Sequence, residues 1–237
     1  MRSSRLPGKV MLPILGRSML ELMIERLRRV PKIDEIVVAT TVDQSCQPIM
    51  DLAASLGVGC FRGSEDDVLE RVLQAARFAH GDVIVETTGD CPLIDPEVIN
   101  QVITAYNSSG VDYCSNILQR TYPRGMDVQV FSVDTLAKVA ELTDDPTDHE
   151  HVSLYIYEHP ELFRLLNVRN SLPTESSRFR LTVDTAEDFE LTRRIYERLY
   201  PANPKFGLND ITYLLEHEPE LSAINAWIDQ QPVQRAQ

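Results

Sequence analysis

The sequence predicts an α/β fold in which helices cover a mostly parallel sheet. Short runs rich in β-branched residues alternate with stretches whose apolar residues recur at helical spacing, and this alternation is typical of βα units. With 237 residues, the chain is long enough to bury one sizeable core. Because no stretch rich in Gly, Ser or Pro divides the chain, we expect residues 1–237 to form a single domain.

Helices and strands alternate at short intervals in the first part of the chain. The first helix begins at a capping box formed by Ser18 and Glu21 and ends before Pro31. Five further elements follow it: a strand over 35–41, a helix over 47–57, a strand over 58–61, a helix capped by Ser64, and a strand over 82–87.

In the second part of the chain, Asp95 and Pro96 predict the N-cap and first residue of a helix that ends at Ser109. The remaining elements are strands over 111–116, 126–132, 163–168 and 179–183, and helices over 147–158, over 185–199 and after Asn209. Segment 116–135 interrupts this order because it is turn-rich and then strand-like. We expect it to shape a substrate site or a dimer contact, and the polar end 230–237 to be frayed.

The charge balance narrows the classes of partner. The chain carries 36 acidic and 23 basic residues, a net charge of −13, which repels polyanions and argues against nucleic acid or an anionic membrane as the main partner. No apolar run reaches membrane length, and no signal-peptide pattern follows the basic start. The four cysteines form no CxxC pair, so we expect free thiols and a cytoplasmic protein.

Basic residues gather at the start of this acidic chain. The first 20 residues contain four basic residues and no acid. Within them, the run Arg2-Ser3-Ser4-Arg5-Leu6-Pro7-Gly8-Lys9 combines cations, hydroxyls and a glycine, a set that can surround a phosphate. A basic terminal tail explains the same residues equally well, and both interpretations stay open.

Two aspartates stand where predicted strands end. Asp90 follows the strand over 82–87, and Asp184 follows the strand over 179–183. Ligands of α/β sheets bind at the carboxyl ends of the strands, and one or two carboxylates with triphosphate oxygens can hold Mg²⁺. The alternatives are a turn aspartate that accepts backbone hydrogen bonds, for Asp90, and a helix N-terminal acid, for Asp184.

His149 and His151 are the remaining candidates for a metal site. Two residues apart on a predicted helix, they point to different faces and would not chelate one ion together. Ordinary surface positions are the favoured interpretation for both.

Several segments in order resemble the cytidylyltransferase family that makes CMP-activated sugar acids, and most of all its spore-coat polysaccharide branch. They are SSRLPGK at 3–9, EIVVATT at 35–41, FRGSEDDVLER at 61–71, TGDCPLIDP at 88–96, YPRGMDVQVF at 122–131, EHV at 150–152 and LTVDTAEDFE at 181–190. The resemblance implies a Rossmann-like three-layer α/β/α nucleotidyltransferase domain. It also implies transfer of CMP from CTP to a sugar or sugar acid with release of pyrophosphate.

The resemblance also implies roles for individual residues. Lys9, Asp90 and Asp184 would be catalytic, and Asp90 and Asp184 would bind Mg²⁺, the implied cofactor. Ser3, Ser4, Arg5 and Lys9 would line the triphosphate, Thr88 and Gly89 would lie near the nucleotide, and Tyr122, Arg124 and Asp127 would face the sugar. Relatives of this family usually dimerise, so a homodimer is expected, with CTP and a sugar as the small-molecule partners.

The resemblance breaks at the N-terminus. Members of this family begin with a hydrophobic strand that ends in Ala-Arg directly before the position of Met1, so we expect the first strand of the sheet to be missing from this sequence and the native chain to start earlier. Two other functions stay open: a nucleotidyltransferase that uses another nucleoside triphosphate or a sugar phosphate, and a non-catalytic nucleotide or sugar binder that is a remnant of the enzyme.

Overall fold

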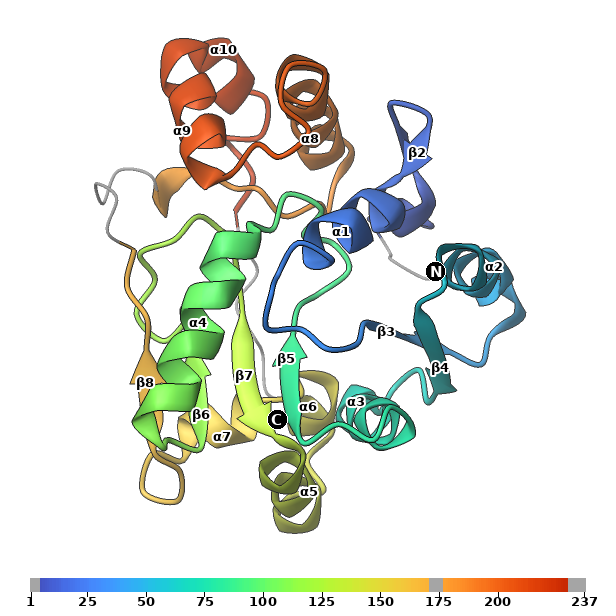
Figure 1. Ribbon diagram of the computed structural model, residues 1–237, viewed down its shortest axis with the longest axis vertical. Helices are drawn as coiled ribbons and strands as arrows, with labels where there is room; N and C mark the ends of the chain where they lie inside the picture. The colour runs from blue at the N-terminus through green and yellow to red at the C-terminus, as the bar shows by residue number, and fades with distance from the viewer. Residues whose placement is uncertain (1–4, 171–176, 230–237) are drawn as a thin grey trace.

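The computed structural model describes residues 5–170 and 177–229 (Figure 1). Its strands are β1 Pro13–Ile14, β2 Arg17–Ser18, β3 Val37–Thr41, β4 Gly59–Gly63, β5 Val83–Glu86, β6 Tyr113–Ser115, β7 Gln129–Ser132 and β8 Leu165–Asn167. Its helices are α1 Met19–Leu27, α2 Gln47–Leu56, α3 Val68–Phe78, α4 Pro96–Ser109, α5 Val133–Leu142, α6 Pro146–Glu150, α7 Leu154–Glu158, α8 Ala186–Leu199, α9 Leu208–His217 and α10 Pro219–Ser222, and the 3-10 turns are η1 Lys9–Met11 and η2 Gln44–Cys46.

The larger sheet has the strand order β5-β7-β6-β8. β6 pairs with β8 in parallel, whereas β7 is antiparallel to both β5 and β6. Strands β5, β6 and β8 therefore run in one direction and β7 alone runs against them. This strand explains why segment 116–135 interrupts the βα order: the chain leaves β6, loops over 116–128 and returns between β5 and β6.

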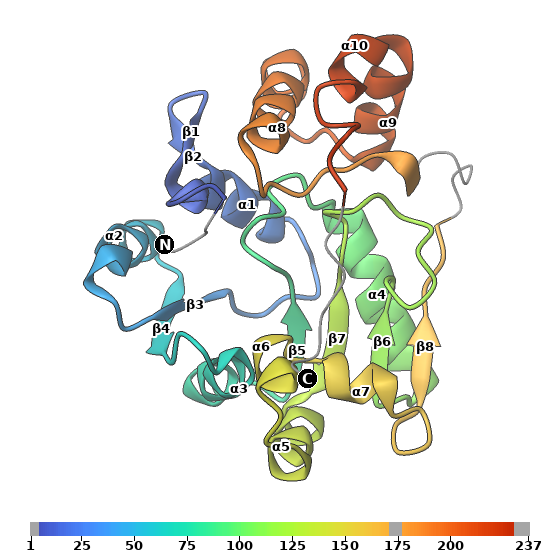
Figure 2. The same ribbon diagram turned by 180° about the vertical axis from the view of Figure 1, so that it is seen from behind.

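Alternate residues of the sheet pack into two different cores. Cys114 and Val130 lie in the core beneath α4, whereas Tyr113 and Phe131 lie in a second core with α3, α5 and α7. Side chains of a strand alternate between the two faces, so the sheet is covered on both sides. Figure 2 shows α5, α6 and α7 on the side of the sheet opposite to α4. The expected three-layer α/β/α arrangement is confirmed.

Strands β3 and β4 form a second, parallel pair whose register joins Val37 to Gly59 and Thr41 to Gly63. In the described residues this pair is a separate sheet from the four-stranded one, so β3 and β5 each have one edge without a strand partner. A small apolar core, which includes Leu20, Ile24 and Ile49, lies between this pair and α1 and α2. The strand that the family resemblance puts before Met1 lies outside this sequence and stays an expectation.

Several predicted helix boundaries are confirmed by their caps. Ser18 accepts a hydrogen bond from the Glu21 N–H at the start of α1, and Asp95 caps α4, which begins at Pro96 and ends at Ser109 as predicted. Thr185 and Asp188 form a capping box at the start of α8. A capping residue and the N–H groups that it accepts from are only two or three positions apart, so a helix start can be predicted from the sequence alone.

Three expectations about elements are wrong. Asp67, and not Ser64, caps α3. The helix over 147–158 is two short helices, α6 and α7, separated by a break in which Val152 has a φ of 43°. Residues 179–183 form no strand and contribute only an isolated bridge between Arg180 and Arg124. In the described part of the chain, no helix is long and apolar enough to cross a membrane.

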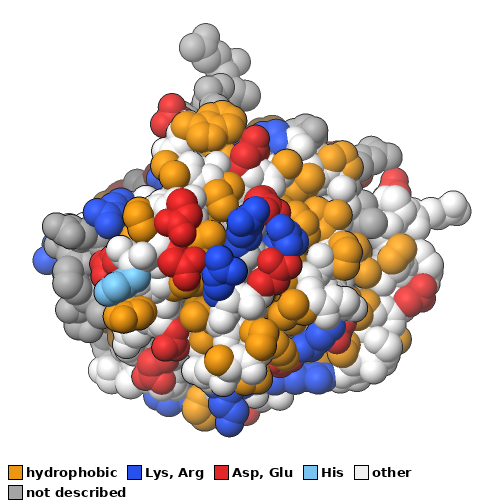
Figure 3. Space-filling view, turned by 90° about the horizontal axis from the view of Figure 1, so that it is seen from above, with side chains coloured by type: hydrophobic (Ala, Val, Ile, Leu, Met, Phe, Trp, Pro, Cys, Tyr) orange, Lys and Arg blue, Asp and Glu red, His pale blue; other side chains and the backbone are white. Residues whose placement is uncertain are grey.

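Charges of both signs lie next to one another on the face seen in Figure 3. Helix α8 contributes to this mixture, because Arg193 and Arg194 both pair with Glu190 and Arg198 pairs with Glu218 at the start of α10. Exposed pairs of this kind contribute little to stability, about 0 to 1 kcal/mol each.

Candidate active site

Asp90 and Asp184, which lie 94 positions apart in the sequence, are brought together by two loops at one end of the four-stranded sheet. Asp90 lies in the loop after β5, and Asp184 lies in the turn before α8. The Val183 N–H donates to the Asp90 carbonyl oxygen over 2.8 Å, and the Thr182 hydroxyl donates to the same oxygen over 3.4 Å. These bonds tie the two loops together through the backbone, so the two carboxylates face one site.

One ammonium group joins the two carboxylates. The Nζ of Lys9 lies 3.0 Å from Oδ2 of Asp90 and 2.9 Å from Oδ1 of Asp184. Arg5 adds a weaker contact, with its Nη2 3.5 Å from Oδ2 of Asp184. Three residues that sequence analysis assigned to phosphate or metal therefore meet at a single point, and Arg5 lies beside it.

A buried network holds Asp184 in place. Arg180 donates from Nη2 to Asp184 over 2.7 Å and from Nε to Asp188 over 3.0 Å. Asp188, 1% exposed, also accepts the backbone N–H groups of Asp184 and Thr185, and Asn225 donates to it over 2.8 Å. Sequence analysis missed Arg180 and Asn225 because nothing local marks a partner that is buried only in the fold.

The opposite charges of Lys9 and the two aspartates stabilise one another's charged forms. Burial acts to lower the pKa of Lys9, but the carboxylates of Asp90 and Asp184 outweigh it and raise that pKa above its ordinary value. Burial acts to raise the pKa of Asp184, but Lys9, Arg5 and Arg180 outweigh it and hold that pKa below its ordinary value. Lys9 and Asp184 are therefore a charged pair at neutral pH.

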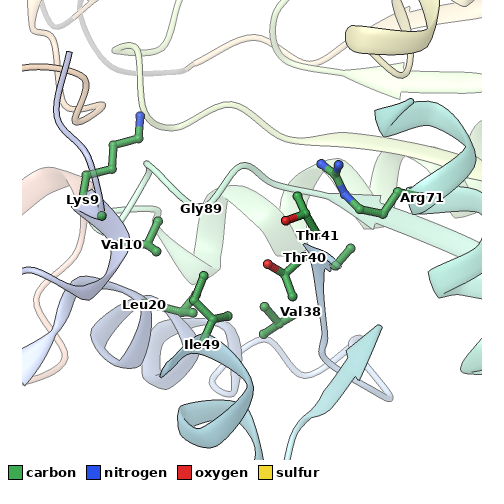
Figure 4. Close-up of a pocket in the computed structure, with 11 residues that line it drawn as sticks. Lys9, Val10, Leu20, Val38, Thr40, Thr41, Ile49, Arg71 and Gly89 are labelled. Carbon is green, nitrogen blue, oxygen red and sulfur yellow. The ribbon is translucent and has the colours of Figure 1, made fainter. Parts of the chain in front are cut away.

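A pocket of about 250 Å³ adjoins this cluster (Figure 4). Figure 4 shows Lys9 and Val10 at one end and Thr40, Thr41 and Arg71 at the other. The remaining lining is Gly8, Leu20, Val38, Ala39, Ile49 and Gly89. The pocket thus runs from Lys9, which contacts the acidic pair, to β3, with mostly apolar walls and a few polar groups, as is typical of small-molecule sites.

Arg71 is a third residue that sequence analysis did not assign to the site, after Arg180 and Asn225. Its Nη1 donates to the carbonyl oxygens of Ser64 and Glu65, and its Nε is buried with no hydrogen-bond partner among the described residues. A buried donor without a partner is rare, and it marks a place where a ligand acceptor would be favourable.

Thr88 and Gly89 lie beside Asp90 and the pocket, and their expected place near a nucleotide stays a prediction. The Thr88 hydroxyl donates to Oδ1 of Asp90 over 2.6 Å and so orients that carboxylate. Gly89 lines the pocket, and a Cβ at this position would lie 3.5 Å from the side chain of Val10. Burial raises the pKa of the neighbouring Cys91 thiol well above its ordinary value, which keeps it a neutral thiol.

The three residues expected to face a sugar have different surroundings. Tyr122 is 2% exposed, lies in the main core and donates its hydroxyl to Gln101 of α4 over 3.0 Å. In this structure it packs in the core, and its contact with a sugar stays a prediction. Arg124 and Asp127 are half-buried, and Asp127 forms a two-bond ion pair with Arg120.

Gly125 explains how the Tyr122–Asp127 segment comes close to Asp184. Its φ is +95°, and a Cβ there would lie 2.5 Å from the carbonyl carbon of Leu181. Only glycine allows this approach, through which the Leu181 N–H donates to the Arg124 carbonyl oxygen over 2.7 Å.

Ser3 and Ser4 lie outside the described residues. His149 hydrogen-bonds through one ring nitrogen to Asp67 over 2.9 Å and through the other to the Thr143 carbonyl, so it ties α6 to the N-cap of α3. The described residues contain no group of three or more His, Cys, Asp or Glu side chains arranged to hold a metal ion.

A three-layer α/β/α fold whose polar groups gather beside a pocket at the carboxyl ends of the strands is typical of α/β proteins that bind nucleotides and other small molecules. The comparison with known families is specific: the chain belongs to the cytidylyltransferase family, whose model matches residues 1–220. The family resemblance of the sequence motifs is thereby confirmed.

Relatives of known sequence or structure agree with this assignment. A cytidylyltransferase from Leptospira borgpetersenii superposes with a TM-score of 0.89 at 33% identity, covering 97% of this chain and 95% of that one. The spore coat polysaccharide biosynthesis protein SpsF of Bacillus subtilis is 31% identical over 226 residues, 93% of this chain and 92% of its own length. A CMP:2-keto-3-deoxy-manno-octonic acid synthetase complexed with CTP shares the fold, with a TM-score of 0.61 at 18% identity over 83% of this chain and 94% of that one.

Proposed function

We propose that this protein transfers CMP from CTP to a sugar or sugar acid, with release of pyrophosphate, in the synthesis of a surface or cell-envelope polysaccharide or glycan. The observation that carries the proposal is the acidic pair Asp90 and Asp184, joined by Lys9 and placed beside the pocket. The names of the similar proteins support CTP as the nucleotide and a polysaccharide as the destination.

The acidic pair fits a divalent cation. Oxygens of Asp90 and Asp184 both lie within 3.0 Å of one nitrogen, so a single small ion could contact both after a shift of less than about 1 Å, given magnesium–oxygen distances of about 2.1 Å. Mg²⁺ usually takes one or two carboxylates and completes its shell with water and substrate phosphates. When bound, Mg²⁺ would neutralise charge on the phosphates of the nucleotide.

The proposed reaction needs no protein nucleophile. An oxygen of a sugar hydroxyl attacks the α-phosphorus of CTP in line, the bond from that phosphorus to the bridging oxygen breaks, and pyrophosphate leaves with its electron pair. The hydroxyl proton passes to solvent. Lys9 and Arg5, with Ser3 and Ser4, would bind the phosphates and offset the charge that builds up during transfer.

The pocket and the Arg124–Asp127 segment suggest where the two substrates bind. Thr40, Thr41 and the unpartnered Nε of Arg71 would receive the nucleoside, with Thr88 and Gly89 near it. Arg124 and Asp127 would face the sugar, because Gly125 holds their segment against residues 181–182, next to Asp184. Three arginines lie around Asp127 and Asp184, namely Arg120, Arg124 and Arg180. Their positive charge would favour a sugar that carries a carboxylate.

The proposal is tested by calorimetric titration with CTP, UTP, GTP and ATP, each with and without Mg²⁺. We expect binding that is selective for CTP, requires Mg²⁺ and is weakened at least about tenfold by Asp90→Asn. Selectivity for another nucleotide would move the function to a different nucleotidyltransferase, and binding without pyrophosphate release on any sugar would favour a non-catalytic binder. No binding of any nucleotide would overturn the proposal.

The proposal includes a compartment for the protein and an oligomeric state. All four cysteines are free, which supports a reducing compartment such as the cytoplasm. A homodimer is the state expected from the family resemblance, and sedimentation of the purified protein tests it.

A further inference from the structure

The backbone of Lys9 is fixed by hydrogen bonds, whereas its long side chain can move from the acidic pair to another anion. Lys9 is the first residue of η1 and follows Gly8, whose φ is 71°. The N–H groups of Met11 and Leu12 donate to the carbonyl oxygens of Gly8 and Lys9. The next residue, Val10, packs against Gly89. The flexible four-carbon stem of Lys9 therefore starts from an anchored turn at the rim of the pocket (Figure 4).

In this arrangement the ammonium of Lys9 stands where a metal ion would stand. The side chains of Lys9, Asp90 and Asp184 are 15%, 23% and 16% exposed, so each is largely withdrawn from water. The charges of Asp90 and Asp184 would repel one another without a shared cation, and Lys9 supplies that cation inside the protein. A divalent ion entering between the carboxylates would meet this ammonium at close range.

We propose that Lys9 is a built-in competitor of the divalent cation, which keeps the Asp90–Asp184 pair closed until an anionic nucleotide gives its ammonium another partner. The inference rests on the proposed function for the identity of that nucleotide, but the competition itself concerns this chain alone. Metal and nucleotide then bind with positive coupling, because each makes the displacement of Lys9 from the acidic pair more favourable.

The competition explains the arrangement of charges around the pair. Arg180 contacts Asp184 from its buried side and is itself fixed by Asp188, so it cannot leave with a ligand. Lys9, in contrast, lines the pocket and contacts both carboxylates, and among the described residues it has no carboxylate partner of its own that holds it as Asp188 holds Arg180. Arg180 is therefore the permanent partner of Asp184, and Lys9 is the exchangeable one.

The test measures metal binding to the protein without nucleotide. Mn²⁺, which also prefers oxygen ligands, is titrated into the wild type and Lys9→Met, and free Mn²⁺ is followed by electron paramagnetic resonance. We expect Lys9→Met to bind one Mn²⁺ at least about tenfold more tightly than the wild type, as for typical site-to-site coupling. Asp90→Asn in the Lys9→Met background should remove this binding.

Lys32→Met is the matched control. It makes the same change in net charge, and Lys32 is an exposed residue that contacts Thr104 away from the site. Its Mn²⁺ affinity should equal that of the wild type. Equal or weaker Mn²⁺ binding by Lys9→Met, or an equal gain in Lys32→Met, would overturn the proposal.

A second measurement on the wild type covers the case in which Lys9→Met does not fold. Acetylation of Lys9 by acetic anhydride, read by mass spectrometry, should be slow relative to Lys32 and should accelerate when Mn²⁺ saturates the site. No acceleration would overturn the competition. Nucleotide is not needed in either arm, so failure of the wild type to bind CTP would sink the proposed function and leave this test intact.

Discussion

At the scale of single residues, Asp188 is held on several sides by the protein and contacts no ligand in our proposal. Its carboxylate accepts from Arg180, Asn225 and two backbone N–H groups. Replacement by Asn removes the charge opposite Arg180, which is 8% exposed, and turns one acceptor into a donor. We expect Asp188→Asn to lower the free energy of unfolding by about 2 to 4 kcal/mol in urea denaturation.

The control for this change is Glu187→Gln, one residue earlier in the same first turn of α8. It loses only an interaction with the helix dipole, about 0.3 to 1 kcal/mol. Similar losses in the two variants would mean that the network around Asp188 contributes nothing beyond helix capping.

Glu86 gives the molecule a pH dependence of its own. Burial raises its pKa to about 7, and its hydrogen-bond partner is the neutral amide of Gln129, over 3.1 Å. A carboxyl with a raised pKa binds its proton more tightly in the folded state, so stability is highest below the unfolded value of about 4.5 and falls as pH rises to about 7. The shift corresponds to a loss of at most about 3 kcal/mol in the free energy of unfolding. The actual loss should be smaller, because the side chain of Glu86 is only half-buried and solvent screens its charge.

Glu86→Gln keeps the shape of the side chain and removes the titration. We expect its melting temperature, measured without ligand between pH 5 and 8, to fall less with rising pH than that of the wild type. Parallel pH profiles would show that Glu86 keeps an ordinary pKa in the folded protein.

At the scale of elements, Gly125 decides how the loop before β7 meets the turn before α8. Gly125→Ala adds a Cβ 2.5 Å from the Leu181 carbonyl carbon at a φ of +95°, so one of the two segments must move. We expect a loss of about 2 kcal/mol or more in the free energy of unfolding. The proposed function adds weaker sugar-dependent turnover to this expectation, because Arg124 and Asp127, which we propose face the sugar, move with the segment.

Gly110→Ala is the control variant, because it introduces a side chain at a positive φ without a close contact. Gly110 ends α4 with a φ of +64°, but a Cβ there has nothing within 4 Å. It should lose only about 1 kcal/mol and leave turnover unchanged. If the two variants behave alike, the close approach at Leu181 does not position the Tyr122–Asp127 segment.

The elements also show which parts of this fold a sequence can predict. Helix α4 agrees with its prediction at both ends, because Asp95 and Pro96 mark its start locally and it ends at Ser109. The place of β7 between β5 and β6 was not, because strand order depends on pairing between distant segments. The same holds at the site: Asp90 and Asp184 follow from motifs, whereas Arg180 and Arg71 act through contacts that exist only after folding.

At the scale of the whole molecule, the β3–β4 pair and the four-stranded sheet differ in how deeply their strands are buried. The residues of β3 and β4 are almost all half-buried, whereas those of β6 are fully buried between two cores. Regions with fewer buried contacts open more often. We expect amide hydrogen exchange in β3 and β4 to be at least about tenfold faster than in β6 and β7, by mass spectrometry on peptic peptides. Equal protection would show that the sheets open as one unit.

Ligand binding connects this difference to the site. The pocket is lined on one side by Val38–Thr41 of β3 and on the other by Gly8–Val10 and Gly89, which lie beside the acidic pair. A nucleotide that fills it would contact both sides and so hold the β3–β4 pair against the larger sheet. Exchange in β3 should then slow in proportion to occupancy, while β6 and β7 change little. Slowing confined to the loop at 88–91 would mean that the ligand binds the acidic pair without entering the pocket, and the nucleoside would have to lie elsewhere.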